Sequence, residues 1–251
     1  MKKVSLLAAV SLIAAQGAFA TSDGAAPAST APCPSPFKGF FLGGNIGYGI
    51  GGAKQSLGSV IAAVPDTTTS TSNRLALRGV DGGINVGYNY VFGNKWGLGL
   101  EFVANWASSN GKLSLVANDA GVPFKYTAQN GAKLNNSLQL RGNFSYVIAN
   151  LVAPKIILGW DNSQWKQTLS STQTGVTKGY KFNKKHRYNG FLWGFGVDFL
   201  AMKHVILGFE YTGTIAKKKK FASIDKATGN KYSSSLVPQY NKFALTAKVI
   251  Y

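Results

Sequence analysis

The sequence predicts an all-β fold, an eight-stranded antiparallel up-and-down β-barrel that spans a membrane. Its last nine residues, 243–251, alternate apolar side chains with smaller or more polar ones and end on Tyr251. A period of two makes one face of a β-strand apolar. Seven further runs of this kind precede it, and short and long connections alternate between them. A basic and then apolar N-terminus adds the pattern of an exported chain, so the barrel belongs in a bacterial outer membrane.

The N-terminal 36 residues are predicted to lie outside the barrel. Lys2 and Lys3 precede an apolar stretch, 4–15, and a small-x-small site ends at Ala20. This pattern predicts a cleaved signal peptide over residues 1–20, because the apolar stretch is shorter than the roughly 20 residues of a membrane-spanning helix. Residues 21–36 are rich in Ala, Pro, Ser and Thr and predict a flexible lead-in, which leaves 37–251 for the barrel.

Eight alternating runs predict the strands. They cover residues 42–50, 83–92, 96–106, 138–148, 155–161, 190–199, 205–212 and 243–251. The clearest runs from Trp96 to Trp106, and at about 3.3 Å per residue and a tilt near 40° it spans about 25 Å, the height of an outer-membrane apolar band. No comparable run has helical spacing. A water-soluble β-sandwich is the alternative that the 45% hydrophobic content leaves open.

The connections favour the barrel over the sandwich. Those at 93–95, 150–154 and 201–204 are short, whereas those at 52–79, 107–134, 162–187 and 216–239 are long and polar. Outer-membrane barrels have short periplasmic turns and long extracellular loops, whereas a sandwich has no reason to collect every long loop at one end. We therefore expect both termini in the periplasm and the long loops outside the cell.

Aromatic residues at strand ends predict two girdles at the membrane boundaries. Trp96 and Tyr251 are expected at the periplasmic boundary, and Trp106 and Trp160 at the outer one.

Together with the N-terminal pattern, three segments carry a family resemblance. These are the glycine- and aromatic-rich opening 40–48, the run 207–211 and the terminal aromatic residue, although Tyr251 stands where the family mostly has Phe. The chain resembles the small eight-stranded outer-membrane proteins of the opacity-protein and OmpA-barrel type. The resemblance implies a surface protein that the outer-membrane assembly machinery inserts, with an adhesin, antigen or envelope-stability role.

Charged residues on the inward parity predict a filled lumen. Eight strands enclose a space that side chains just fill, and buried charges are expected to pair. The predicted lumen residues are Glu101, Arg141, Asp198, Glu210, Lys242 and Lys248. We expect a network centred on Glu101 and Arg141 that acts as packing, with a small porin-like channel as the alternative.

The net charge of +18 predicts a polyanionic partner. Much of the excess lies in the third and fourth long connections, at Lys181, Lys184, Lys185, Arg187, Lys217, Lys218, Lys219 and Lys220. Such a patch could bind nucleic acid, but an exported barrel first meets lipopolysaccharide and then acidic glycans of a host. A solvated charged rim is the plainer explanation. We expect a monomer in outer-membrane lipid.

No catalytic, cofactor or metal site is predicted. The two histidines, His186 and His204, lack evident Ser and Asp partners, and a lipid-modifying hydrolase that pairs His186 with Ser163 or Ser170 is a remote alternative. Cys33 is the single cysteine, so no intrachain disulfide can form, and its role is left open.

Overall fold

The computed structural model describes residues 35–60, 68–93, 95–118, 125–173, 180–224 and 231–251. The predicted signal peptide, the lead-in up to residue 34 and Cys33 lie outside these residues. Ser35, the first described residue, is buried, and the backbone oxygen of Ser35 accepts a hydrogen bond from the Lys38 amide at 3.0 Å.

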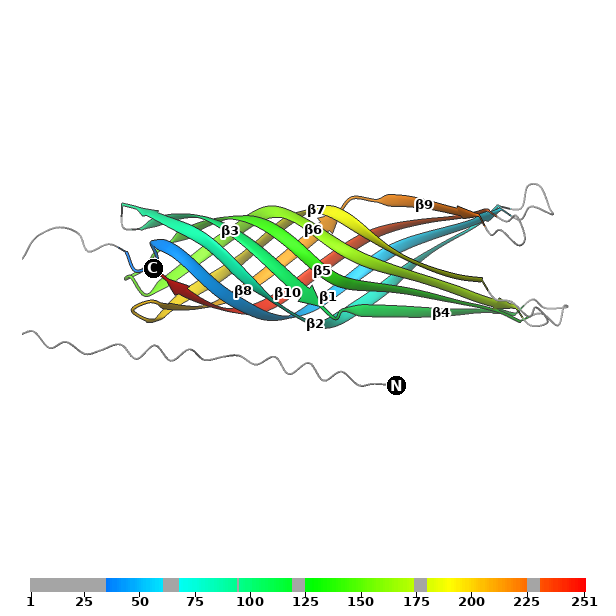
Figure 1. The fold of residues 1–251 in the computed structure, drawn as a ribbon, viewed down its shortest axis with the longest axis horizontal. Coiled ribbons are helices and arrows are strands. Elements are labelled where there is room, and N and C mark those ends of the chain that lie inside the picture. The colour runs from blue at the N-terminus through cyan, green and yellow to red at the C-terminus, as the bar shows by residue number, and fades with distance from the viewer. Residues whose placement is uncertain (1–34, 61–67, 94, 119–124, 174–179, 225–230) are drawn as a thin grey trace, which may run out of the picture. The chain divides into compact units, whose positions relative to one another are not determined.

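Ten β-strands form one antiparallel sheet (Figure 1). They are β1 (Gly39–Val60), β2 (Thr68–Phe92), β3 (Trp96–Ala107), β4 (Asn110–Asn118), β5 (Lys125–Tyr146), β6 (Val152–Gln173), β7 (Tyr180–Met202), β8 (Val205–Ala216), β9 (Lys219–Ile224) and β10 (Lys231–Ile250). The strands β3 and β4 are successive parts of one wall, and so are β8 and β9. The sheet is therefore the predicted ring of eight strands.

The ring is closed by its first and last strands. β1 pairs with β10 from Phe41 opposite Ile250 to Val60 opposite Lys231, and the Tyr251 amide donates to the Phe40 carbonyl at 2.8 Å. A closed ring leaves no unpaired edge inside a bilayer, where backbone groups find no water. The alternating run at the C-terminus is thus needed to complete the barrel.

Side chains alternate across the wall with apolar groups on the outside. In β3, Leu100 is 60% exposed and Phe102 46%, whereas Glu101 is 1% exposed. A water-soluble sheet would bury the two apolar residues and expose the carboxylate, so hydrocarbon must surround this ring. The protein is a transmembrane β-barrel. Among the described residues, no helix is long and apolar enough to cross a bilayer.

The short turns lie where they were predicted, within a few residues. They follow Phe92, Tyr146 and Met202. Between β5 and β6, Ala149 and Asn150 have φ values of 51° and 55°, and the Leu151 amide donates to the Ile148 carbonyl at 3.0 Å. This left-handed pair gives the tight turn the twist that a hairpin needs. We call this end of the barrel, which also holds Tyr251, the proximal end.

The long connections are mostly not loops, which corrects the prediction. β1 continues to Val60 and β2 begins at Thr68, and β5, β6, β7 and β10 extend in the same way (Figure 1). We call the parts of the strands that continue into the expected long connections, away from the proximal end, the distal extensions. The alternating pattern does not reveal them, because the outward face of a strand outside a bilayer need not be apolar. Segments rich in Ser and Thr then pair as strands without an alternating pattern.

Candidate functional site

Every acidic side chain that the structure describes lies in the lumen. The five carboxylates are Asp81, Glu101, Asp161, Asp198 and Glu210, and four buried cations, Arg141, Lys155, Lys242 and Lys248, lie among them. All six predicted lumen residues are buried. Three lumen charges, Asp81, Lys155 and Asp161, were not predicted. Each lies at or just beyond the edge of a predicted strand, although each shares the inward parity of its neighbours.

The network is centred on Glu210, which corrects the expected centre. Its two carboxylate oxygens lie 2.9 Å from Arg141 Nη1 and 2.7 Å from Lys155 Nζ, and Lys248 Nζ lies 3.7 Å away. Arg141 does stand opposite Glu101 in the register of β3 and β5. Its guanidinium nevertheless crosses the lumen to β8, so the expected ion pair of Glu101 with Arg141 is replaced by one with Glu210.

The charges of the central layer balance. Lys155 Nζ also donates to both oxygens of Asp198, at 2.8 and 2.9 Å. Glu101 accepts hydrogen bonds from the side-chain amides of Asn85 and Asn143, at 2.6 and 3.1 Å. Three cations therefore face three carboxylates: Arg141, Lys155 and Lys248 against Glu101, Asp198 and Glu210. A balanced and hydrogen-bonded set can remain ionised away from bulk water.

A second ion pair lies beside this layer. Lys242 Nζ is 2.7 Å from a carboxylate oxygen of Asp81, and it also donates to the Asn45 side-chain oxygen at 2.7 Å. The Tyr240 hydroxyl donates to the other Asp81 oxygen at 3.0 Å. Lys242 thus has fixed partners within the lumen.

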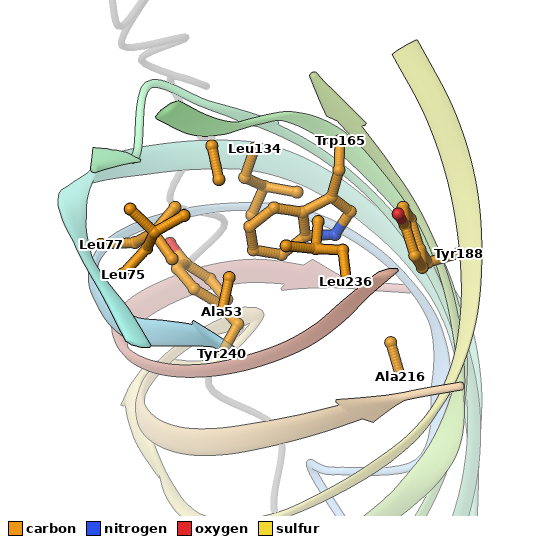
Figure 2. Packing of buried hydrophobic residues seen from close by; sticks show 10 residues of the cluster. Ala53, Leu75, Leu77, Leu134, Trp165, Tyr188, Ala216, Leu236 and Tyr240 are labelled. Carbon is orange, nitrogen blue, oxygen red and sulfur yellow. The ribbon is translucent and has the colours of Figure 1, made fainter. Parts of the chain in front are cut away.

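Two apolar layers enclose the charged one. The proximal cluster consists of Phe37, Phe41, Val91, Val147, Ala153, Ile206 and Ile250. The distal cluster, shown in Figure 2, consists of Ala53, Leu75, Leu77, Ala132, Leu134, Trp165, Tyr188, Ala216, Leu236 and Tyr240. A cavity of about 20 Å³ beside Trp165 and Asp161 has room for about one water molecule. Side chains therefore occupy the described lumen in the proximal, central and distal layers.

The solvent-exposed side chains of the distal extensions that the structure describes carry only positive formal charge. These distal cations are Lys54, Arg78, Lys112, Lys133, Lys166, Lys184, Lys185, Arg187, Lys217, Lys218, Lys219 and Lys220. All are exposed except Lys166, which is half-buried. The predicted cations are thus on the surface, apart from Lys181, whose side chain lies outside the described set. Lys54, Arg78, Lys112, Lys133 and Lys166 were not predicted.

Three distal cations form a row across adjacent strands. Lys133 of β5 stands opposite Lys166 of β6, which stands opposite Lys185 of β7. Partners in neighbouring strands are about 4.8 Å apart, and like charges placed directly opposite each other destabilise a sheet. We call these three residues the lysine row. It depends on the register of three strands far apart in the chain, so sequence reasoning could not find it.

The third and fourth connections contact each other near Arg187. Arg187 Nη1 donates to the Asn162 side-chain oxygen at 2.6 Å, and Lys219 Nζ donates to the Arg187 carbonyl. Lys219 Nζ also lies 5.5 Å from the centre of the Tyr188 ring. Partial burial, with the neighbouring charges of Lys184 and Lys219, lowers the pKa of His186 below its usual range.

The four girdle aromatics are exposed on the barrel surface. Trp96 and Tyr251 lie at the proximal end, and the Trp96 ring packs against those of Phe144 and Tyr146, at 5.4 and 4.7 Å between centroids. Trp106 lies near the distal end of β3, and Trp160 of β6 directly precedes Asp161, which is buried in the lumen.

The described residues contain no cluster of three potential metal ligands. The Ser163 hydroxyl, one candidate partner of His186, is buried and accepts a hydrogen bond from Trp165 Nε1 at 3.0 Å.

Comparison with known proteins adds only structural likeness. No family model matches the chain, and no curated protein matches it. Among solved structures, it is similar to the outer membrane protease OmpT of Escherichia coli, with 10% identity, 89% of this chain and 100% of the other covered, and a TM-score of 0.48. It is also similar to the outer membrane protein OprG of Pseudomonas aeruginosa, with 15% identity, 85% of this chain and 97% of the other covered, and a TM-score of 0.47. For Neisserial surface protein A the identity is 9%, the coverage is 84% of this chain and 97% of the other, and the TM-score is 0.39. At these identities the likeness decides neither a ligand nor an activity.

Proposed function

We propose that this protein is a non-enzymatic surface protein of the outer membrane whose distal cations hold polyanions. The ligands are the phosphates of lipopolysaccharide or the acidic groups of glycans on another cell. One observation carries the proposal: the described carboxylates all lie in the lumen, so none neutralises the cations outside. No described carboxylate lies beside the lysine row, and we propose that another molecule supplies its counter-charge.

The height of the distal cations supports lipopolysaccharide as the first ligand. Arg78 lies two residues beyond Val80, an exposed apolar residue, and Lys217 lies two residues beyond Ile215. Two residues of a strand tilted by about 40° rise about 5 Å. These cations therefore begin at the level of the headgroups, where each Lys or Arg near an anionic surface contributes about 1 kcal/mol.

The filled lumen supports a binding role over a porin-like channel. The proximal cluster, the charged layer and the distal cluster would all have to rearrange before ions could pass. The short turns favour a periplasmic proximal end, with both termini there and the distal extensions outside the cell. We further propose that the outer-membrane assembly machinery inserts the barrel and that it functions as a monomer.

Charge removal at the two ends of the barrel tests this function. One variant replaces the lysine row by glutamine (Lys133→Gln, Lys166→Gln, Lys185→Gln). The matched control replaces three exposed lysines of the proximal end, Lys38, Lys95 and Lys203, by glutamine. Loss of three contacts of about 1 kcal/mol each weakens lipopolysaccharide binding about 100-fold.

A second variant neutralises Lys217, Lys218, Lys219 and Lys220 together. We expect weaker binding of lipopolysaccharide and of acidic oligosaccharides, with a strong salt dependence. If both distal variants and high salt leave the dissociation constants unchanged, the proposed function is wrong. Equal losses in the distal variants and the proximal control would show attraction by net charge alone, which also contradicts a distal site.

A further inference from the structure

The distal part of the ring is open along one line. β7 pairs with β8 only from Gly190 onward, so its distal half, from Tyr180 to Asn189, has β6 as its single described ladder partner. β9 in turn pairs with β10 only. Two strand edges therefore border a seam between β7 and β9. At the other interruption the walls meet closely, since a Cβ on Gly111 of β4 would stand 2.1 Å from the Ala76 carbonyl of β2.

Pro238 provides a physical reason for the seam. β10 pairs with β8 up to Gln239 opposite Ile215, and with β9 from Leu236 opposite Lys219. The three residues 216–218 therefore stand opposite only two, Val237 and Pro238. The extra residue between β8 and β9 is a bulge. Proline has no amide hydrogen to donate to the ladder, and a bulge bends the strand that carries it. β9 is thus redirected where it would otherwise continue beside β7.

The polar backbone groups of β7 that face the seam can be identified. The Lys217 amide donates to the Asn189 carbonyl at 3.0 Å, and Lys219 Nζ donates to the Arg187 carbonyl. In an antiparallel strand the amide and carbonyl of one residue point to the same side, and alternate residues share that side. Asn183 and Lys185 therefore present their backbone groups to the seam, and no described strand pairs with them there.

We propose that this edge of β7 binds an extended acidic segment of another protein, which adds to the sheet as a further strand. An exposed strand edge is a template for such addition, and the backbone hydrogen bonds supply affinity while the side chains supply selectivity. Lysines at an edge also repel unsuitable strands. They exclude a second copy of this basic chain and favour a strand with carboxylates.

The flanking side chains define the strand that fits. Lys219 of β9 reaches across the seam to the Arg187 carbonyl and the Tyr188 ring. On the outer face, Lys185 and Arg187 project from β7, and Lys220 lies across the seam on β9. Carboxylates at alternate positions of the bound strand would face them. The positions in between turn toward buried Tyr188 and the distal cluster, so small or apolar residues suit them. This partner is distinct from the proposed polyanion, because it needs the backbone of β7 as well as the charge.

A peptide probe tests the proposal on the full-length barrel in detergent or nanodiscs. The probe is a nine-residue peptide that alternates glutamate with threonine and valine. Asn183→Pro removes one edge amide without changing a charge, and Asn183→Ala keeps that amide as the matched control. We expect Asn183→Pro to raise the dissociation constant at least about tenfold and Asn183→Ala to leave it within about twofold. Heat-dependent gel mobility checks that both variants are folded.

Two further measurements separate strand addition from charge attraction. The same peptide with N-methyl groups on alternate amides keeps its carboxylates but loses the edge hydrogen bonds, so its binding should fail. Hydrogen exchange should slow at the amides of Asn183 and Lys185 when the unmodified peptide binds. Equal binding of the methylated peptide, or no effect of Asn183→Pro, overturns the proposal. Lipopolysaccharide binding should survive Asn183→Pro, so failure here is distinguishable from failure of the polyanion site.

Discussion

Glu210 neutralises more buried cations than any other described carboxylate, so its replacement by glutamine is the sharpest test of the lumen. It lies within 4 Å of the charged nitrogen atoms of Arg141, Lys155 and Lys248. Glu210→Gln preserves the shape of the side chain but leaves these three cations against Glu101 and Asp198. One buried positive charge is then uncompensated.

Removing one partner of a buried ion pair costs about 3–5 kcal/mol. We expect the free energy of unfolding to fall by about that amount, a factor of about 10²–10⁴ in the unfolding equilibrium. Adding Arg141→Met to Glu210→Gln restores the balance of two cations against two carboxylates. The double variant should therefore be more stable than Glu210→Gln alone.

Urea unfolding in lipid vesicles, followed by tryptophan fluorescence and heat-dependent gel mobility, measures both changes. A Glu210→Gln barrel within about 1 kcal/mol of the wild type would show that the network is loosely hydrated. A double variant less stable than both single variants would contradict charge balance as the cause.

Three other predictions address the layers and the surface. In planar bilayers, neither the wild type nor Phe37→Ala should conduct ions, because the charged layer and the distal cluster still close the lumen when the proximal cluster is weakened. Regular conductance steps in the wild type would instead support a channel. Trp165→Ala should destabilise the distal extensions by about 3–5 kcal/mol, seen as faster hydrogen exchange there but unchanged exchange in the membrane part; uniform acceleration would show that the two parts unfold together. NMR titration should give His186 a pKa below 6.5, because burial and the charges of Lys184 and Lys219 disfavour its protonated form. A bound polyanion favours that form and should raise the pKa, so binding should tighten as the pH falls from about 7 to about 5; tighter binding at higher pH would contradict this sign.

The transmembrane part could be predicted because a bilayer makes the alternation obligatory. Leu98, Leu100 and Phe102 must face hydrocarbon, so Glu101 between them must face the lumen. The same parity identified the six lumen charges. It could not identify their partners, since the long Arg141 side chain reaches Glu210 across the lumen rather than its register neighbour Glu101.

The distal part could not be predicted because its constraint is weaker. Trp165 lies in a connection that was expected to be a loop and Tyr188 directly follows that connection, yet both belong to the distal cluster in the lumen. Lys133 and Lys166 became recognisable as site residues only through strand register. The seam between β7 and β9 likewise follows from the end of a pairing, which no local sequence pattern reports.

We propose that the distal cations of the barrel hold the phosphates of the surrounding lipopolysaccharide. Equilibrium binding of lipid A with and without its phosphate groups, at about 50 and about 200 mM salt, tests it most directly. We predict binding that requires the phosphates, weakens with salt and is lost with Lys133, Lys166 and Lys185 replaced by glutamine. Equal affinity for dephosphorylated lipid A, at either salt concentration, would contradict the claim.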